Sequence, residues 1–303
     1  MNAKLTRYAR LSIGAALATI VLKSFAYWVT GSVGLLSDAV ESLVNLAGGI
    51  MAYWMLTVAA KPADQEHAYG HGKAEYFSSG VEGSLIVVAA ITIGWEAVPR
   101  LFHPQVLEKI GVGLLVSIAA SLINLGVALW ILRASRRYES ITLEANAKHL
   151  LTDVWTSVGV VIAVALVPLT GWTWLDPVIA ILVAANIIWT GVGIVRRSIG
   201  GLMDQSIGAS DLGTVDRVLE PYRKEGVSFH AVLTRKAGAR RFVSFHVLVP
   251  GDWTVQRGHE LAERIEGEVR SALGNAHVIT HLEPSDDPAS FEDATLERDL
   301  PRQ

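Results

Sequence analysis

The sequence predicts an α-helical membrane protein, in which a bundle of six transmembrane helices is followed by a small α+β domain. The 303 residues are 51% hydrophobic and only 18% charged, whereas about 25% of residues are charged in an ordinary soluble domain. Nearly all long apolar stretches precede Arg197, and residues 204–303 have the composition of a soluble domain. Six apolar stretches reach the roughly 20 residues that a helix needs to cross a bilayer.

These six predicted spans lie near residues 8–29, 33–57, 79–101, 110–132, 143–169 and 174–195. The first is longer than the apolar part of a signal peptide, and a second span follows it at once, so we expect it to be retained. The chain then divides into a transmembrane domain (1–203), a cytoplasmic domain (204–285) and a tail (286–303). The tail is acidic and contains prolines but few apolar residues, so we expect it to be disordered.

Basic residues beside the spans indicate the orientation of the bundle. One side of the predicted bundle carries Lys4, Arg7, Arg10, Lys61, Lys73, Arg133, Arg136, Arg137, Lys148, Arg196 and Arg197. The opposite side carries only Arg100 and Lys109. Because basic residues accumulate on the cytoplasmic side of membrane proteins, both termini and the C-terminal domain are predicted to be cytoplasmic.

Charge and cysteine content exclude several functions. The net charge of −3 gives no basic footprint for nucleic acid. The chain contains no cysteine, which excludes disulfides, thiolate metal sites and thiol redox chemistry. Any bound metal must therefore be held by nitrogen and oxygen atoms.

In two predicted spans, ionisable and polar residues are clustered, although a charged group at the bilayer centre costs roughly 3 kcal/mol or more. Asp38, Glu41 and Asn45 follow one stripe of the second span, and His149 and Asp153 are one turn apart in the fifth. Two interpretations fit these stripes: ligands of one ion, or side chains that hydrogen-bond to neighbouring helices. For Glu96 in the third span and Asn124 in the fourth, we expect helix-packing or interfacial roles.

The loop after the second span is rich in residues that bind metals. It reads KPADQEHAYGHGKAEY and places Asp64, His67 and His71 within eight residues. This pattern fits a metal site, and it also fits a solvated polar loop.

The C-terminal domain shows an α-β-β-α-β pattern, which we interpret as two helices with a small antiparallel sheet. The segments VSFHAVLTRK, RRFVSFHVLV and HVITHLE are typical of strands. Helical spacing of apolar residues is found at Leu212, Val215, Val218 and Leu219, and again at Leu261, Ile265, Val269 and Leu273.

Several segments resemble the cation diffusion facilitator family of bacterial metal efflux transporters. They are GSVGLLSDAVESLVN (31–45), PADQEHAYGHGKAE (62–75), HLLTD (149–153), LDP (175–177) and GGLMDQS (200–206). The similarity in layout runs from about residue 8 to residue 285. The HGKAE segment and the HxxxD motif of the fifth span are together specific for this family.

The resemblance implies sites, partners and a location. It implies a homodimer in the bacterial cytoplasmic (inner) membrane that exchanges a divalent cation for protons, with an ion pair between Lys73 and Asp204 joining the subunits. It implies a transport site at Glu41, Asn45, His149 and Asp153 and a loop site at Asp64, His67 and His71. In the cytoplasmic domain it implies metal ligands at His230, His246, His259, His281 and Glu283. His277 is either an additional ligand or an ordinary surface residue.

The second span departs from the family pattern. Many members have His or Asp and then Asp where this chain has Glu41 and Asn45. Asparagine coordinates through its carbonyl oxygen but brings no charge and carries no proton. Asp38, one turn before Glu41, is either a compensating carboxylate or a helix-packing group.

The ligands fit several metals. Two carboxylates and one imidazole would neutralise a dication, and these ligand types accept zinc, iron, cobalt, nickel, cadmium or manganese. We expect zinc as the transported and bound metal.

Three classes of function compete for this pattern: a metal transporter, an intramembrane metallohydrolase and a membrane-anchored metal sensor. A hydrolase needs a general base beside an open metal position, and the sequence has no HExxH segment. A sensor has no use for Glu41, Asn45, His149 and Asp153 in lipid. We therefore expect a secondary transporter and no enzyme, with metal leaving as protons compete for its ligands.

Overall fold

The computed structural model describes residues 2–30, 33–102, 112–172 and 174–292. Within the helices, it does not describe the side chains at 2–4, 30, 33–38, 40, 41, 112–114, 160, 163–169 and 176. The chain forms two compact units, Met1–Leu202 and Met203–Gln303.

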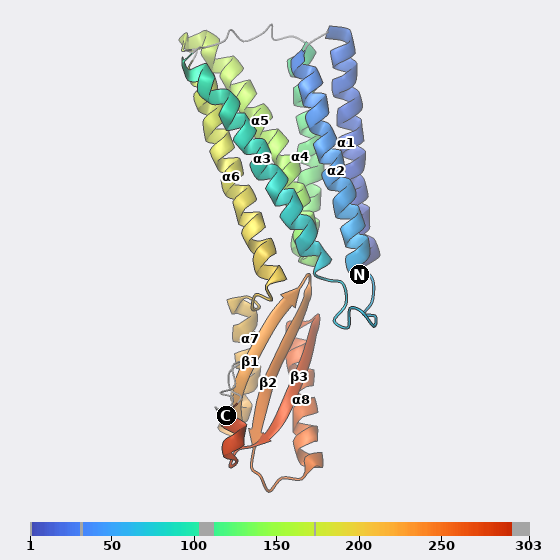
Figure 1. Cartoon of the computed structure of the whole chain (residues 1–303), viewed down its shortest axis with the longest axis vertical. Coiled ribbons are helices and arrows are strands. Elements are labelled where there is room, and N and C mark those ends of the chain that lie inside the picture. The colour runs from blue at the N-terminus through green and yellow to red at the C-terminus, as the bar shows by residue number, and fades with distance from the viewer. Residues whose placement is uncertain (1, 31–32, 103–111, 173, 293–303) are drawn as a thin grey trace, which may run out of the picture. The chain divides into compact units, whose positions relative to one another are not determined.

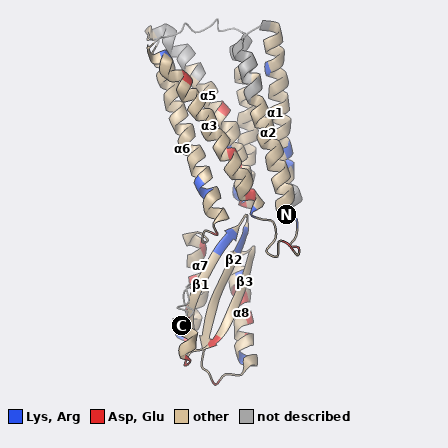
Figure 2. Cartoon of the chain, viewed as in Figure 1, with Lys and Arg blue, Asp and Glu red and all other residues tan. Residues whose placement is uncertain are grey.

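The described part of the first unit consists of six long helices (Figure 1). They are α1 (Asn2–Thr30), α2 (Val33–Ala59), α3 (Ala74–Phe102), α4 (Val112–Tyr138), α5 (Ile141–Thr170) and α6 (Leu175–Leu202). The described stretches of α1, α2, α3, α4 and α6 are long and apolar enough to span a membrane. Charged residues are sparse along these helices, as Figure 2 shows. The predicted helical membrane domain is thereby confirmed.

Helix α5 is central to the bundle because it contacts each of the five other helices. Its first turns are packed through Leu143, Ala147 and Leu150, which are at most 1% exposed. Polar residues on such a helix face neighbouring protein instead of lipid, so α5 can carry a polar site across an apolar bundle.

Helices α3 and α6 pack closely through small residues. A methyl group on Gly191 of α6 would lie 2.7 Å from Val87 of α3 and 3.1 Å from the carbonyl oxygen of Gly83. Glycine at such positions lets two helix backbones approach.

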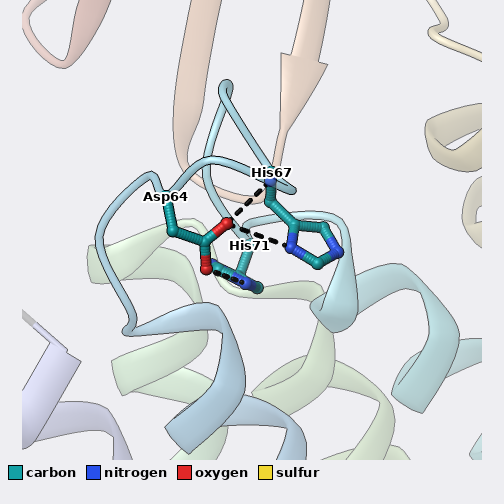
Figure 3. Close-up of side chains that lie close together, drawn as sticks. All are labelled: Asp64, His67 and His71. Carbon is teal, nitrogen blue, oxygen red and sulfur yellow. Dashed lines mark hydrogen bonds and ion pairs between the residues drawn. The ribbon is translucent and has the colours of Figure 1, made fainter.

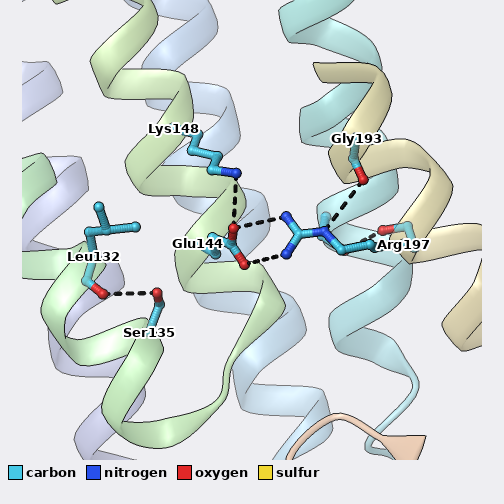
Figure 4. Close-up of polar contacts among 8 residues, drawn as sticks. Leu132, Ser135, Glu144, Lys148, Gly193 and Arg197 are labelled. Atoms are coloured by element: carbon cyan, nitrogen blue, oxygen red, sulfur yellow. Dashed lines mark hydrogen bonds and ion pairs between the residues drawn. The ribbon is translucent and has the colours of Figure 1, made fainter. Parts of the chain in front are cut away.

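A polar clamp joins α5 to α6 (Figure 4). Arg197 donates two hydrogen bonds to the Glu144 carboxylate, at 2.9 and 2.8 Å, and Lys148 lies 2.9 Å from the same carboxylate. The clamp joins the first turns of α5 to the last turns of α6. These two helices run antiparallel, so α5 begins at the end of the bundle where α6 ends.

The second unit has the predicted α-β-β-α-β order. Its elements are α7 (Ala209–Lys224), β1 (Ser228–Ala237), β2 (Arg240–Val249), α8 (Val255–Leu273), β3 (Ala276–Pro284) and the 3-10 helix η1 (Pro288–Phe291). The sheet order is β1-β2-β3. Strands β1 and β2 are antiparallel, but β3 is parallel to β2. The expected purely antiparallel sheet is therefore wrong, because α8 is a crossover connection that returns the chain in the same direction.

The hydrophobic core of this unit lies between the two helices and one face of the sheet. The core positions expected for the second helix, Leu261, Ile265, Val269 and Leu273, are all buried. They pack with Val215 and Leu219 of α7 and with alternate residues of β2, namely Val243, Phe245, Val247 and Val249. Because side chains of a strand alternate between faces, Ser244 and His246 lie on the opposite face.

The segment after β3 differs from the expected disordered tail. Residues 288–291 form η1, whose start is capped by the Asp287 carboxylate accepting from the Ala289 N–H at 2.9 Å. The Ser290 hydroxyl donates to the Pro284 carbonyl at 2.8 Å. These local bonds order the segment without a large apolar contribution. Residues 293–303 lie outside the described part.

Candidate metal-binding sites

The polar residues of α2 and α5 meet inside the bundle. The Asp153 Oδ2 atom accepts hydrogen bonds from Asn45 Nδ2 of α2 at 2.5 Å and from Asn124 Nδ2 of α4 at 3.0 Å. Asn45 and Asp153 are 3% and 8% exposed. Two helices therefore direct amide side chains to a carboxylate on a third helix within an apolar bundle.

Lone pairs remain unused on the two amides and on His149, the neighbour of Asp153 in α5. Among the described residues, Asn45 Oδ1, Asn124 Oδ1 and His149 Nδ1 are buried and have no hydrogen-bond partner. An unpaired buried polar atom costs about 1–3 kcal/mol, so their accumulation fits a site that a ligand completes. His149 lies one turn before Asp153 on the same face of α5.

Glu41 lies one turn before Asn45 in α2, and Asp38 lies nearly two turns before it. Both side chains are outside the described part, so their predicted roles at the transport site stay predictions.

The loop residues Asp64, His67 and His71 lie together (Figure 3). Asp64 Oδ1 is 3.3 Å from His67 Nδ1, and Asp64 Oδ2 is 3.4 Å from His71 Nε2. His71 Nδ1 is 3.2 Å from the Pro62 carbonyl oxygen. When Nδ1–H donates to that oxygen, Nε2 keeps its lone pair on the Asp64 side, which is the arrangement that metal-binding histidines use.

Backbone donors fix the charge of the loop carboxylate. The His67 N–H donates to Asp64 Oδ1 at 2.7 Å, and the Glu66 N–H donates to the same atom at 3.1 Å. The hydrogen bond from the His67 backbone holds the pKa of Asp64 below its usual value. An ordinary aspartate is already ionised at neutral pH, so this carboxylate can bind a cation there without releasing a proton.

A second cluster lies on the face of the sheet opposite the core. His230 is paired with His246, and His246 is paired with His281, so three histidines form a row across the strands. His230 Nε2 is 3.0 Å from His246 Nδ1 and 2.9 Å from Glu283 Oε2, and His246 Nδ1 is 3.2 Å from Glu283 Oε1. Glu283 is only 6% exposed. Two imidazoles and a carboxylate at this spacing suit zinc.

The remaining predicted residues of this domain lie at or beyond the edge of the cluster. His281 Nε2 is 3.5 Å from Glu283 Oε1, but its side chain is 66% exposed. His259 is exposed on α8 and is not part of the cluster found among the described residues. His277 lies edge-on to the Phe242 ring.

The predicted intersubunit pair has contacts within the chain. Lys73 Nζ donates to the Leu202 carbonyl at 3.2 Å. Asp204 Oδ1 accepts from Arg235 at 3.2 Å. An ion pair between two subunits is not tested by one chain.

Asn124 contacts Asp153 of a neighbouring helix and Glu96 is exposed, so both agree with the expected helix-packing or interfacial roles. Sequence reasoning misses two residues, Glu82 and Asn146. Glu82 of α3 is fully buried and accepts from Asn146 Nδ2 of α5 at 3.1 Å, although neither residue is among the predicted ligands. The sequence does contain a signal for both residues, namely helical spacing from other polar residues. Glu82 is two turns after Glu75 on one stripe of α3, and Asn146 is one turn before His149.

Comparison with known proteins agrees with this architecture. Residues 9–203 match the family model of the cation efflux transmembrane domain, and residues 209–285 match that of the cation efflux protein cytoplasmic domain. The two models together cover nearly all described residues.

Relatives align along nearly their whole length. A Synechocystis protein named only as an uncharacterized transporter is 54% identical over 99% of this chain and 100% of its own length. The cation-efflux pump FieF of Shewanella oneidensis is 28% identical over 91% of this chain and 92% of its own. FieF of Klebsiella pneumoniae is 25% identical over 97% of each. The chain therefore belongs to the cation diffusion facilitator family of cation efflux transporters.

Proposed function

We propose that this transporter expels zinc from the cytoplasm in exchange for protons. The observation that carries the proposal is the buried Asp153 carboxylate, held between the amides of Asn45 and Asn124 inside an otherwise apolar bundle. Two neutral amides orient this carboxylate, and a carboxylate is a ligand for divalent cations. Efflux of divalent cations is the function of the family.

The surrounding atoms suit a dication of the zinc type. Asn45 Oδ1 is buried without a partner among the described residues and can donate a lone pair to a metal, as can an imidazole nitrogen of His149. Glu41, one turn from Asn45, is assigned as the second carboxylate. Imidazole and carboxylate ligands are those that zinc accepts in proteins.

Proton exchange follows from the chemistry of these ligands. His149, Asp153 and Glu41 bind a metal only when they are deprotonated, so protons and metal compete for the same lone pairs. We infer alternating access: the site loads zinc from the cytoplasm, and protonation on the far side releases it. Asn45 carries no proton, so the exchange is assigned to the other three ligands.

The loop and domain clusters are assigned as additional zinc sites. Asp64, His67 and His71 place their ligand atoms within 4.8 Å of one another, as do His230, His246 and Glu283. Both sets contain two imidazoles and one carboxylate, a combination found in zinc proteins.

Assembly and location are also proposals. The match of residues 209–285 to the family's cytoplasmic domain supports a homodimer in which Lys73 and Asp204 join the subunits. The basic residues on one side of the bundle support cytoplasmic termini in the bacterial cytoplasmic membrane.

The test is zinc flux through the full chain in proteoliposomes. Asp153→Ala and His149→Ala should abolish flux and leave a folded protein on size exclusion. Thr152→Ala is the matched control, because it removes a neighbouring buried hydroxyl that bonds to the Lys148 carbonyl of its own helix. Normal flux in Asp153→Ala would refute the site, and peptide cleavage without metal flux would indicate a hydrolase.

A further inference from the structure

Glu82 is a buried carboxylate that the site at Asp153 does not use. It is 0% exposed. Its Oε1 atom accepts from Asn146 Nδ2, while Oε2 has no partner among the described residues. A buried carboxylate with one amide donor is expensive in an apolar bundle. A purely structural role would leave fewer of its lone pairs unpaired.

Further unpartnered atoms lie on the residues around Glu82. Asn146 Oδ1 and His149 Nδ1 are buried and have no partner among the described residues. Asn146 is 2% exposed and His149 is 6% exposed. A carboxylate oxygen, an amide carbonyl and an imidazole nitrogen are thus all left without a hydrogen bond, and each is a metal ligand type.

Gly48 provides room beside these atoms. A methyl group on Gly48 would lie 3.3 Å from His149 Nδ1 and 3.4 Å from Glu82 Oε1. Both side chains therefore border the space that a larger residue would fill. Zinc bonds to nitrogen and oxygen are about 2.0–2.2 Å long, so shifts of about 1 Å toward each other would let both side chains contact one ion beside Gly48.

The helix directions place this group one turn from the Asp153 site. Gly48 is three residues after Asn45 in α2, and Asn146 is three residues before His149 in α5. Helix α2 ends at the end of the bundle where α5 begins. The steps from Asn45 to Gly48 and from His149 to Asn146 therefore both lead toward that end, by about 5 Å. From the first turn of α3, the buried residues Glu75, Ser78, Ser79 and Glu82 form a polar stripe that leads to the group.

We propose that Glu82, Asn146 and Nδ1 of His149 form a second position for the transported dication, one helical turn before the site at Asn45 and Asp153. The proposal rests on the proposed function, because it needs an ion that travels through the bundle. The ion arrives at Glu82 and moves on to Asp153. His149 serves both positions, since its ring carries two nitrogens.

The first test is zinc flux in proteoliposomes with Glu82→Gln. The side-chain carbonyl of this variant can still accept from Asn146, so the fold should persist while the charge is lost. We expect kcat/KM for zinc to fall at least tenfold and Glu82→Asp to recover part of it. Glu96→Gln, an exposed change on the same helix, should equal the parent. Equal kinetics of Glu82→Gln and Glu96→Gln would overturn the proposal.

A second pair of variants fills the space without changing a charge. Gly48→Ala should lower kcat/KM because its methyl group crowds His149 and Glu82. In Gly49→Ala the new methyl group would be equally crowded, at 3.2 Å from Ile13. It does not contact His149 or Glu82, so this variant should keep parental kinetics. Parental kinetics in Gly48→Ala, or equal losses in both variants, would contradict the proposed position.

A binding measurement separates this proposal from the proposed function. Cobalt(II) absorption is recorded on full chains that also carry His67→Ala, His71→Ala, His230→Ala and His246→Ala. Adding Asp153→Ala should leave one cobalt ion bound, and adding Glu82→Gln as well should remove it, whereas Glu96→Gln should not. Loss of all cobalt in Asp153→Ala, or its retention with Glu82→Gln, would overturn the second position. A parent that moves no metal would instead refute the proposed function.

Discussion

Asp153 shows how a neutral amide changes a metal site. Its Oδ2 atom accepts from Asn45 and Asn124, and both amides keep a carbonyl oxygen without a partner among the described residues. The amides hold the carboxylate in place, but they neither add negative charge nor carry protons. A family member with Asp at the position of Asn45 would have a site with one more charge.

Asn45→Asp tests the contribution of this amide. A further carboxylate next to Asp153 should tighten zinc binding near neutral pH by roughly tenfold, or about 1.4 kcal/mol. It should also steepen the pH dependence of affinity, because metal must displace an additional proton. The measurement is zinc affinity against pH in parent and variant, with the loop and domain histidines replaced in both. Superimposable curves would show that residue 45 points away from the ion.

The residues of this site could be predicted only where one helix carries the pattern. The spacing of His149 and Asp153 is visible in the sequence because both belong to α5. Glu82 and Asn146 face one another across α3 and α5, and no local spacing predicts which helices pack together. The partner of Asn124 cannot be predicted for the same reason, since Asp153 is on another helix.

At the scale of elements, the contact of α3 with α6 depends on a glycine, Gly191, at the point where the two helices pack. Gly191→Ala should destabilise the bundle by about 1–3 kcal/mol, because its methyl group would overlap Val87 and Ile86 of α3. Gly193→Ala, two residues later in the same helix, meets nothing within 4 Å and should be neutral or slightly stabilising. Thermal unfolding in detergent compares the two variants. Equal melting temperatures would show that α3 and α6 do not pack as described.

The sheet brings together histidines that lie far apart in the sequence. His230→Ala should remove a zinc ion from the purified protein, because it deletes a ligand that contacts both His246 and Glu283. His277→Ala removes a histidine of the same sheet that lies against Phe242, and should leave the zinc content unchanged. Metal analysis of the full chain gives the result, and equal zinc content in the two variants would refute this site.

The strands of this domain could be predicted from their alternating pattern, but the direction of β3 could not. Periodicity shows which residues share a face and says nothing about which neighbour a strand pairs with. The parallel pairing of β2 and β3 depends on how α8 packs over the sheet through Ile265 and Val269. The row formed by His230, His246 and His281 follows from that pairing.

At the scale of the whole molecule, the proposed dimer depends on charged residues near the junction of the two units. Lys73→Ala or Asp204→Ala should weaken the dimer by roughly 1 kcal/mol, the value of a good exposed ion pair. Metal preference should stay the same, because neither residue is assigned as a ligand. Lys61→Ala removes the same charge from the same loop and is the control. Cross-linking yield and flux measure both effects, and a changed metal preference at full rate would contradict the assignment.

The central claim is that zinc and protons share one buried site and move in opposite directions. The most direct test is a flux assay in proteoliposomes with an imposed pH gradient, in which a metal dye and a pH dye are read together. We expect zinc to accumulate in the more acidic compartment while protons leave it, and Asp153→Ala to abolish both signals. Zinc flux that is independent of the pH gradient and is accompanied by no proton movement would contradict the claim.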